Sequence, residues 1–258
     1  MVGVTYDLLG RCGQLGNQMF QYSLLLGIKY KNGYDIIIDP ETKNKSYLFN
    51  FFNLNECIIN PFIAKNEYRE NDFHFNNNIF DVETDTNFIG YYQSEKYFSH
   101  CKDIVKKEFT FKNEINEKVY DFIKNYEQTN LISVHVRRGD YLLNPHIHPQ
   151  PPLDYYTQSM NMLDDGNTTF IFTSDDIKWC KENFKNENII YSEGDLIFDM
   201  CLTSSCDGHI ISNSTFSWWG AWLGKNNNKK IISPKVWFGE GNSHLDTKDL
   251  YCENFIKL

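Results

Sequence analysis

Two adjacent arginines lie in the segment HVRRGDY, residues 135–141, directly after the mostly apolar run 131–136. A guanidinium stays charged in proteins and can hold a carboxylate or a phosphate through two parallel hydrogen bonds. Arg137 and Arg138 therefore predict a concentrated positive site that suits a diphosphate. Because a departing diphosphate gains negative charge, a cation placed there stabilises the transition state. The neighbouring Asp140 gives a second interpretation, a loop staple, and we expect one arginine to bind phosphate and the other to hold the scaffold.

Polar residues also follow two other apolar runs. The segment NSTFS, residues 213–217, precedes a helical pattern. Hydroxyls and backbone N–H groups at a helix N-terminus bind anions, although the same residues are ordinary N-caps. Asp175 and Asp176 follow the apolar run at 170–172. A carboxylate in that place can accept hydrogen bonds from guanine, and it could equally cap the next helix or hold a metal ion.

A glycine-rich turn, GRCGQLGNQ at residues 10–18, lies near the N-terminus. It lacks the GK[ST] pattern of a phosphate-binding loop, so ATP hydrolysis is not supported. Its glycines allow a backbone to approach a ligand closely, and Asn17 could reach that ligand. A tight turn explains the glycines equally well. No Asp-x-Asp triplet and no Cys-x-x-Cys pair occurs in the sequence, which therefore indicates no metal site.

The elements that must position these residues alternate regularly in the second half of the chain. Strands are predicted at 131–136, 170–172, 189–191, 209–212 and, as the last one, 230–233, with helices at 155–163, from 179, from 199 and at 218–222. Such alternation predicts a parallel, Rossmann-like sheet whose ligands lie at the carboxyl ends of the strands.

The first half opens with a strand at 2–9, the glycine turn and a helix, which is the start of an α/β unit. A short buried strand is predicted at 35–39, whereas residues 41–100 show weak periodicity. A helical pattern follows at 112–126. We place a domain boundary near Gln128, so that the predicted domains are 1–128 and 129–258.

Composition narrows the class of protein. The 258 residues are 41% hydrophobic and 23% charged, which is typical of a soluble globular protein. The formal net charge of −9 argues against nucleic acid as a partner. The aromatic share of 16% is mostly explained by core packing. No signal peptide or membrane-spanning run is visible, and the composition does not exclude peripheral contact with a membrane surface.

Six segments together resemble glycosyltransferase family 11, the α-1,2-fucosyltransferases. They are GQLGNQMFQY (13–22), GYYQSEKYF (90–98), HVRRGDY (135–141), the spacing from His148 to LDYY (153–156), FIFTSDDIKWC (170–180) and DMCLTSSCDGHIISNSTFSWWGAWL (199–223). They occur in family order and are spread over most of the chain, from residue 13 to residue 223. The resemblance implies a GT-B-like α/β fold, in which two Rossmann-like domains face a cleft. The domain 1–128 would lie on the acceptor side, and the domain 129–258 would bind the GDP-sugar.

The resemblance also implies an activity. L-Fucose would pass from GDP-β-L-fucose to a glycan hydroxyl with inversion, the galactose 2-OH being the family expectation, without a metal ion or a cofactor. Arg137, Asp140 and Asn17 would serve catalysis, with Arg137 on the diphosphate and Asn17 near the fucose and the acceptor. The implied substrate-binding residues, at the guanosine, the phosphates and the sugar, are His135, Arg138, Gly16, Gln18, Asp175, Asp176, Ser214, Thr215, Phe216 and Ser217.

Departures from the family pattern leave the acceptor open. Gln14 stands where the family usually has Gly or Arg, and residues 41–88 match little. A transferase that uses another GDP- or NDP-sugar would share the phosphate-binding residues. A carbohydrate-binding module without catalysis would explain the aromatic residues but not the paired arginines. Animal members carry a membrane anchor and stem that this sequence lacks, which favours a cytoplasmic enzyme of bacterial or viral type.

The general base has two readings. Inverting transfer requires that the acceptor hydroxyl lose its proton as the new bond forms. Asp140, Glu95, His146 and His148 lie on predicted loops. An ion pair with an arginine explains Asp140, and either an ion pair with Lys96 or the start of a helix explains Glu95. In the second reading the departing phosphate takes the proton, and Asn17 orients the hydroxyl. We favour the second reading because no carboxylate stands out from its structural role.

Overall fold

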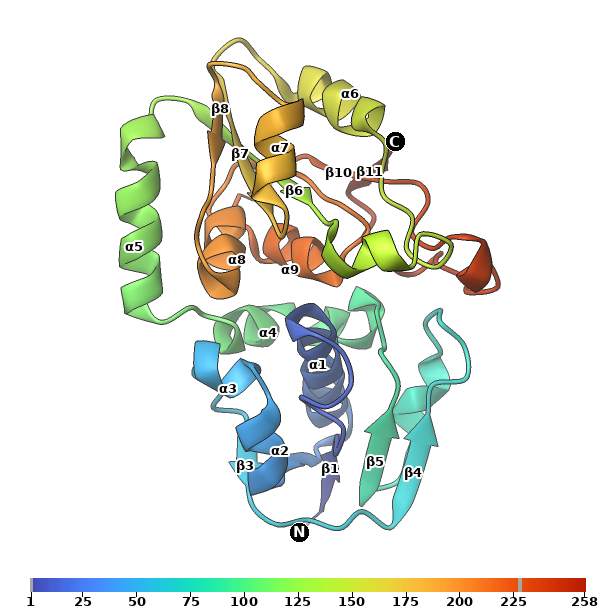
Figure 1. Ribbon diagram of the computed structural model, residues 1–258. Helices are drawn as coiled ribbons and strands as arrows, with labels where there is room; N and C mark the ends of the chain where they lie inside the picture. The colour runs from blue at the N-terminus through green and yellow to red at the C-terminus, as the bar shows by residue number, and fades with distance from the viewer. Residues whose placement is uncertain (1, 227–228) are drawn as a thin grey trace. The chain divides into compact units, whose positions relative to one another are not determined.

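Two compact α/β units make up the chain in the computed structural model, which describes residues 2–226 and 229–258 (Figure 1). Unit 1 comprises Met1–Lys112 and Leu245–Cys252, and unit 2 comprises Asn113–His244 and Glu253–Leu258. The chain therefore returns from unit 2 to unit 1 once before it ends. None of the described helices combines the length and the apolar composition that a membrane-spanning segment requires.

Unit 1 is built on a parallel five-stranded sheet in the order β3-β2-β1-β5-β4. Its elements, in chain order, are β1 (Gly3–Thr5), α1 (Leu15–Asn32), β2 (Asp35–Ile38), α2 (Pro40–Lys45), α3 (Leu48–Phe51), β3 (Cys57–Ile59), β4 (Asn66–Arg69), the 3-10 helix η1 (Asn77–Asp81), β5 (Thr86–Ile89), η2 (Glu95–Tyr97), η3 (Ser99–Cys101) and α4 (Lys102–Glu108). Chain order reverses between β1 and β5, because β2 and β3 lie on one side of β1 and β5 on the other.

Helix α1 forms much of the unit 1 core. All its residues from Met19 to Ile28 are buried, which suits a helix enclosed on most sides. It ends at Gly33, whose left-handed backbone (φ 76°) lets its N–H donate to Lys29 O at 2.9 Å. The sequence pattern did not resolve β3, whose 3 residues CII are too few to show a period, or β4, whose residues NEYR lack the alternation that marks a half-buried strand.

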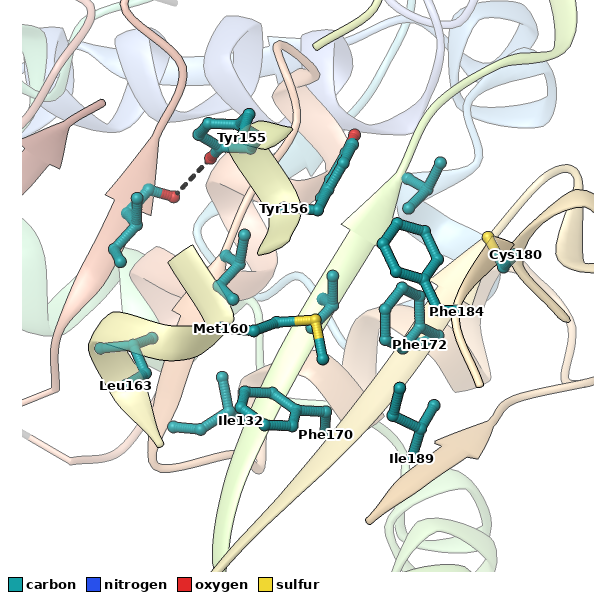
Figure 2. Close-up of a cluster of buried hydrophobic side chains, with 14 residues drawn as sticks. Ile132, Tyr155, Tyr156, Met160, Leu163, Phe170, Phe172, Cys180, Phe184 and Ile189 are labelled. Atoms are coloured by element: carbon teal, nitrogen blue, oxygen red, sulfur yellow. Dashed lines mark hydrogen bonds between the residues drawn. The ribbon is translucent and has the colours of Figure 1, made fainter. Parts of the chain in front are cut away.

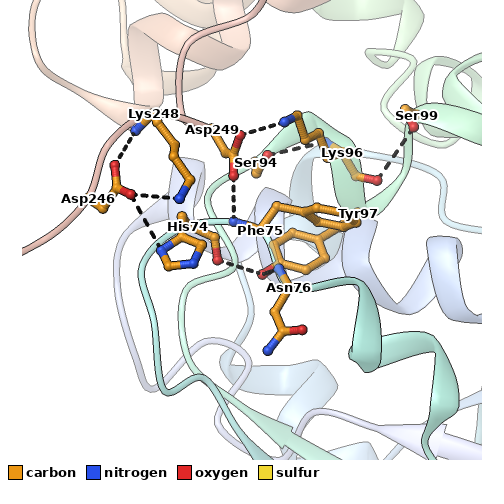
Figure 3. Close-up of polar contacts among 10 residues, drawn as sticks. All are labelled: His74, Phe75, Asn76, Ser94, Lys96, Tyr97, Ser99, Asp246, Lys248 and Asp249. Atoms are coloured by element: carbon orange, nitrogen blue, oxygen red, sulfur yellow. Dashed lines mark hydrogen bonds and ion pairs between the residues drawn. The ribbon is translucent and has the colours of Figure 1, made fainter.

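The segment Leu245–Cys252 is fastened to unit 1 by charged side chains (Figure 3). Asp249 is 9% exposed; its carboxylate pairs with Lys96 Nζ at 2.5 Å and accepts from Phe75 N at 3.0 Å. Asp246 lies 2.9 Å from Lys248 Nζ and 3.7 Å from His74 Nδ1. Because Asp249 is largely buried and bound on both oxygens, it is the main anchor of the returning segment.

Unit 2 is built on a parallel six-stranded sheet in the order β11-β10-β9-β6-β7-β8. Its elements, in chain order, are α5 (Asn113–Ile123), η4 (Lys124–Tyr126), β6 (Asn130–Val136), η5 (Gly139–Leu143), α6 (Leu153–Leu163), β7 (Thr168–Ser174), α7 (Ile177–Asn183), β8 (Ile189–Tyr191), α8 (Leu196–Ser204), β9 (Gly208–Ile210), α9 (Thr215–Leu223), β10 (Ile231–Ser233), η6 (Glu240–Asn242) and β11 (Phe255–Lys257). This is the strand order of a Rossmann sheet, and it confirms the predicted parallel arrangement.

The unit 2 core lies between the sheet and helices α6 and α7 (Figure 2). Alternate residues of β6 and β7, such as Ile132 and Phe172, pack there against Tyr156 and Met160 of α6. The Tyr155 hydroxyl donates to the carbonyls of Ile211 and Ile232, so this aromatic residue is buried with its polar atom satisfied.

Two predictions about the chain's organisation differ from the structure. The division falls between Lys112 and Asn113 rather than near Gln128, because α5 packs on α8 of unit 2. Phe122 of α5 contacts Phe198 edge-on, with ring centroids 5.7 Å apart. The last strand is β11 rather than 230–233; it adds to β10 in parallel register but has only one buried side chain, which gave no sequence signal.

Candidate active site

Register places the two arginines beside the two aspartates. Val136 and Ser174, the last residues of β6 and β7, are register partners in adjacent parallel strands. One step further along both strands, Arg137 Nη1 lies 3.0 Å from Asp175 Oδ2. The next step brings Arg138 Nε within 3.0 Å of Asp176 Oδ2. The carboxyl ends of two neighbouring strands thus form one charged cluster.

Arg138 is held as a part of the scaffold. Its side chain is 17% exposed, and its guanidinium lies 4.1 Å from the centre of the Trp179 ring. Nη1 donates to Gln150 Oε1 at 2.8 Å, in addition to the pair with Asp176. Asp176 also caps α7 by accepting from Trp179 N. The hydrogen bond from Arg138 holds the pKa of Asp176 below its usual value, so the carboxylate is charged at neutral pH.

Arg137 is the more accessible of the two arginines. Its side chain is 28% exposed, and Nη2 lies 2.6 Å from Asp140 Oδ1, a carboxylate that is itself 64% exposed. The guanidinium also lies 5.4 Å from the centre of the Tyr141 ring, on which His148 stacks at 4.5 Å. Because the Asp140 carboxylate is largely exposed and its ion pair with Arg137 lies at the surface, an anionic ligand can compete for this guanidinium.

Gly139 makes room for the cluster. A side chain on this residue would place its Cβ 2.3 Å from Asp175 Oδ2, the atom that pairs with Arg137. Asp175 Oδ1 accepts from Arg138 N at 2.8 Å, so the carboxylate is bound from both sides and has little freedom to move away. The glycine of the HVRRGDY segment is therefore required by the close approach of Asp175.

The boundary between β6 and β9 is the point where chain order reverses in the unit 2 sheet. His135 Nδ1 shares a hydrogen bond of 2.8 Å with Ser212 Oγ across this boundary. Burial and the Arg137 charge lower the pKa of His135 to about 3, so its ring is neutral. The Tyr141 hydroxyl donates to Asn213 O at 3.1 Å. Ligands of open α/β sheets bind at such a reversal, and Arg137 lies at its edge.

Helix α9 begins at the same boundary. Ser214 is its N-cap residue and makes no side-chain cap hydrogen bond, so ordinary capping does not explain it. The first hydrogen bond within the helix runs from Trp218 N to Ser214 O. The backbone N–H groups of residues 215–217, in the first turn, come before this bond. Ser217 is buried and its hydroxyl donates to the carbonyls of Ser212 and Ser214, and Phe216 packs on His135 at 5.2 Å. Ser217 and Phe216 therefore have structural contacts at the start of α9. Contact of Thr215, Phe216 and Ser217 with phosphate stays a prediction.

Unit 1 also has polar side chains near the point where chain order reverses in its sheet, between β1 and β5. Asn17, in the first turn of α1, accepts a hydrogen bond of 3.0 Å from Gln93 Nε2. Gln18 is fully buried; its amide donates to Gly13 O and accepts from Ser46 and Tyr47, so it holds the glycine turn. Among the three residues 16–18, only Asn17 is not buried.

The candidate bases have structural partners. Asp140 pairs with Arg137 as expected. Glu95 is the first residue of η2, as one of its two explanations predicted, and it pairs with Lys102 Nζ at 2.8 Å rather than with Lys96. Burial lowers the pKa of His148, and the ring stacks on Tyr141. His146 is exposed. Across residues 2–226 and 229–258, no cluster of three or more His, Cys, Asp or Glu side chains could hold a metal ion.

The sequence profile described as Glycosyl transferase family 11 matches residues 7–256. The chain belongs to glycosyltransferase family 11. It is 31% identical to the O-antigen biosynthesis glycosyltransferase WbnK of Escherichia coli, over 92% of this chain and 96% of that protein. It is 32% identical to an alpha-1,2-colitosyltransferase of Escherichia coli, over 95% and 96% of the two chains. Galactoside alpha-(1,2)-fucosyltransferase 2 of Sus scrofa is 26% identical over 82% of this chain and 67% of its own length.

Solved structures share the fold of this family 11 chain. NodZ alpha-1,6-fucosyltransferase soaked with GDP-fucose superposes with a TM-score of 0.60 at 12% identity, covering 91% of this chain and 95% of that one. POFUT1 in complex with GDP gives a TM-score of 0.58 at 12% identity, covering 90% and 98%. The fold is GT-B-like, with two Rossmann-like α/β units, as the family resemblance implied.

The sequence interpretation did not single out Trp179, Gln150 or Gln93. Trp179 and Gln150 enclose Arg138, and Gln93 binds Asn17. Each acts through a partner far away in sequence, and its own position has no distinctive local pattern. A signal was present in the sequence: β6 is followed by two arginines and β7 by two aspartates. In-register pairing of these strands would have placed Arg138 beside Asp176, three residues before Trp179.

Proposed function

We propose that this chain is an inverting transferase that moves L-fucose from GDP-β-L-fucose to a glycan hydroxyl, with the galactose 2-OH as acceptor. The observation that carries the donor side is the position of Arg137, at the carboxyl edge of a Rossmann-type sheet beside its reversal point. Membership of family 11 and the α-1,2-transferase names of its relatives support the transfer.

The proposed reaction breaks the bond from the sugar anomeric carbon to the β-phosphate oxygen and forms a bond from that carbon to the acceptor oxygen. Arg137 stabilises the charge that gathers on the departing GDP. The acceptor proton passes to a phosphate oxygen, and Asn17 orients the acceptor hydroxyl. Arg138, enclosed by Trp179 and Asp176, keeps its neighbour Arg137 in place.

A donor panel tests the proposed function. GDP should raise the melting temperature of the purified protein, whereas UDP and CMP should not. Turnover is then measured with GDP-fucose and with other GDP-sugars, against galactose-terminated and other glycans. Lack of stabilisation by any nucleotide would favour a non-catalytic carbohydrate-binding module. If the protein transfers only from another GDP-sugar, the sugar of that donor would replace L-fucose in the proposal.

GDP-colitose is the second donor that a specific observation favours. A relative of 32% identity over 95% of this chain is named as an alpha-1,2-colitosyltransferase. The residues proposed to bind the phosphates would not distinguish the two donors, because GDP is the part that both donors share. The ratio of kcat/KM for GDP-fucose and GDP-colitose with one acceptor decides between them.

We expect full activity in EDTA. The proposed charge stabilisation comes from Arg137, and Asp175 and Asp176 are both engaged by arginines. Transfer rates are compared in buffer treated with EDTA and in buffer with added Mg²⁺ or Mn²⁺. A strict requirement for either ion would overturn the assignment of charge stabilisation to the arginine.

We also expect Asp140→Asn and Glu95→Gln to retain measurable turnover. Each carboxylate has an ion-pair partner that accounts for it, Arg137 for Asp140 and Lys102 for Glu95. GDP affinity should not fall in Asp140→Asn, since its carboxylate competes with phosphate for Arg137. Kinetics and GDP titration of both variants check this. Loss of turnover in one variant, with folding and GDP affinity intact, would identify that residue as the base.

A further inference from the structure

Three residues without a role in the proposed reaction lie at the carboxyl edge of the unit 1 sheet. Glu70 follows β4, and Tyr92 and Gln93 belong to the turn that follows β5. β5 is the neighbour of β1 at the point where chain order reverses, which is where open α/β sheets bind ligands. Asn17 lies at the same edge, in the first turn of α1.

The turn after β5 has an uncommon backbone. Tyr92 has a φ of 53° and Gly90 a φ of 155°. The left-handed region is an outlier for a bulky side chain such as that of Tyr92. Conformations of this kind persist where the surrounding contacts fix them, and they cluster at functional sites.

Side chains from neighbouring strands fix this turn. Both carboxylate oxygens of Glu70 accept backbone hydrogen bonds, from Tyr91 N at 2.7 Å and from Tyr92 N at 2.9 Å. The Tyr6 hydroxyl accepts from Gly90 N at 2.8 Å and donates to Gly90 O. The Tyr92 ring is 1% exposed and packs edge-on against Tyr6. The turn is therefore rigid at its start.

The end of the same segment is fastened as well. Lys96 Nζ pairs with the largely buried Asp249 of the returning segment at 2.5 Å (Figure 3). Ser94 N donates to Tyr92 O at 2.8 Å, and Ser94 Oγ accepts from Lys96 N. Gln93 lies between two anchored ends, so its side chain starts from a fixed backbone.

Gln93 is 6% exposed, and only one end of its side-chain amide makes a hydrogen bond to a described residue. Nε2 donates to Asn17 Oδ1 at 3.0 Å, whereas the buried Oε1 has no hydrogen-bond partner among the described residues. The bond that is made fixes the plane of the Asn17 amide and turns its Nδ2 group away from Gln93.

We propose that Gln93 is the positioning residue for Asn17. By holding Oδ1, it makes Asn17 present its Nδ2 donor to the oxygen of the acceptor hydroxyl. The hydroxyl proton is then left to pass to the departing phosphate. Glu70 and Asp249 serve this arrangement by fixing the segment that carries Gln93. The inference rests on the proposed transfer to a sugar hydroxyl and assigns its acceptor-side geometry.

The test compares Gln93→Met, Asn17→Ala and the double variant, with the exposed Gln158→Met as the matched control. Methionine keeps the volume of Gln93 and removes the buried acceptor that has no partner, so the melting temperature should not fall. The acceptor kcat/KM of Gln93→Met should fall about tenfold, the effect of one lost hydrogen bond of this kind. GDP affinity should stay unchanged. The double variant should match Asn17→Ala, because Gln93 acts only through Asn17.

Two outcomes would overturn the positioning role. In one, Gln93→Met lowers the melting temperature while the folded enzyme keeps wild-type kcat/KM, which is a purely structural effect. In the other, the effects of the two single variants multiply in the double variant. Failure of the wild-type protein to transfer from any GDP-sugar is a different result: it contradicts the proposed function, and the role of Asn17 with it.

Discussion

Arg137→Ala should lower kcat by about 10²–10³-fold, the loss that follows removal of one preorganised group from a developing negative charge. Folding should be retained, because none of the three side chains is deeply buried: Arg137 is 28% exposed, and its ion-pair partners Asp140 and Asp175 are 64% and 26% exposed. Pairs of this kind contribute little to stability. Arg137→Lys restores only part of the rate, since an ammonium cannot form the two parallel bonds of a guanidinium.

The measurement for Arg137 is kcat and KM for the GDP-sugar, with the melting temperature recorded in parallel. Lys124→Ala is the control, because it removes a cation from an exposed ion pair, with Asp121, that has no part in the proposed reaction. Wild-type turnover in Arg137→Ala would refute the assignment of charge stabilisation to this residue. Wild-type turnover in both Arg137→Ala and Arg138→Ala would refute the donor site as a whole.

Arg138→Ala acts mainly on stability. The substitution leaves Asp176 and Gln150 without their partner and removes the contact with the Trp179 ring. Removing one member of a partly buried pair costs about 1–3 kcal/mol when its residual exposure is taken into account. The melting temperature should fall by about 5 °C for a chain of this size. Activity falls too, because Arg137 loses its rigid neighbour.

Asp176→Asn separates the two contributions of this carboxylate. The amide oxygen can still cap α7 at Trp179 N, whereas the charge pair with Arg138 is lost. We expect an intermediate fall in melting temperature, measured by differential scanning calorimetry. An unchanged melting temperature in Arg138→Ala, with a loss of kcat as large as in Arg137→Ala, would instead place Arg138 on the diphosphate.

The sequence predicted the elements of unit 2 well because its central strands are buried on both faces and separated by amphipathic helices. It failed at β3 and β11, which are only 3 residues long and too short to show a period, and at β4, whose sequence NEYR is mostly polar. The charged cluster at 137–140 was predicted as a pair of arginines near one carboxylate. A scaffold role for one of the two arginines was predicted as well, but the residues alone did not say which one is enclosed, because Trp179 and Gln150 are brought to Arg138 by tertiary packing.

The path of the chain between β10 and β11 has a consequence for the order of assembly. These two strands pair in unit 2, but residues 245–252 between them belong to unit 1. During synthesis from the N-terminus, residues 1–112 therefore emerge without Asp249, the partner of Lys96 and of Phe75 N. The unit 2 sheet likewise lacks its edge strand until residues 255–257 are released. Neither unit reaches its final set of contacts as a nascent domain, and both are completed together after translation has passed residue 257.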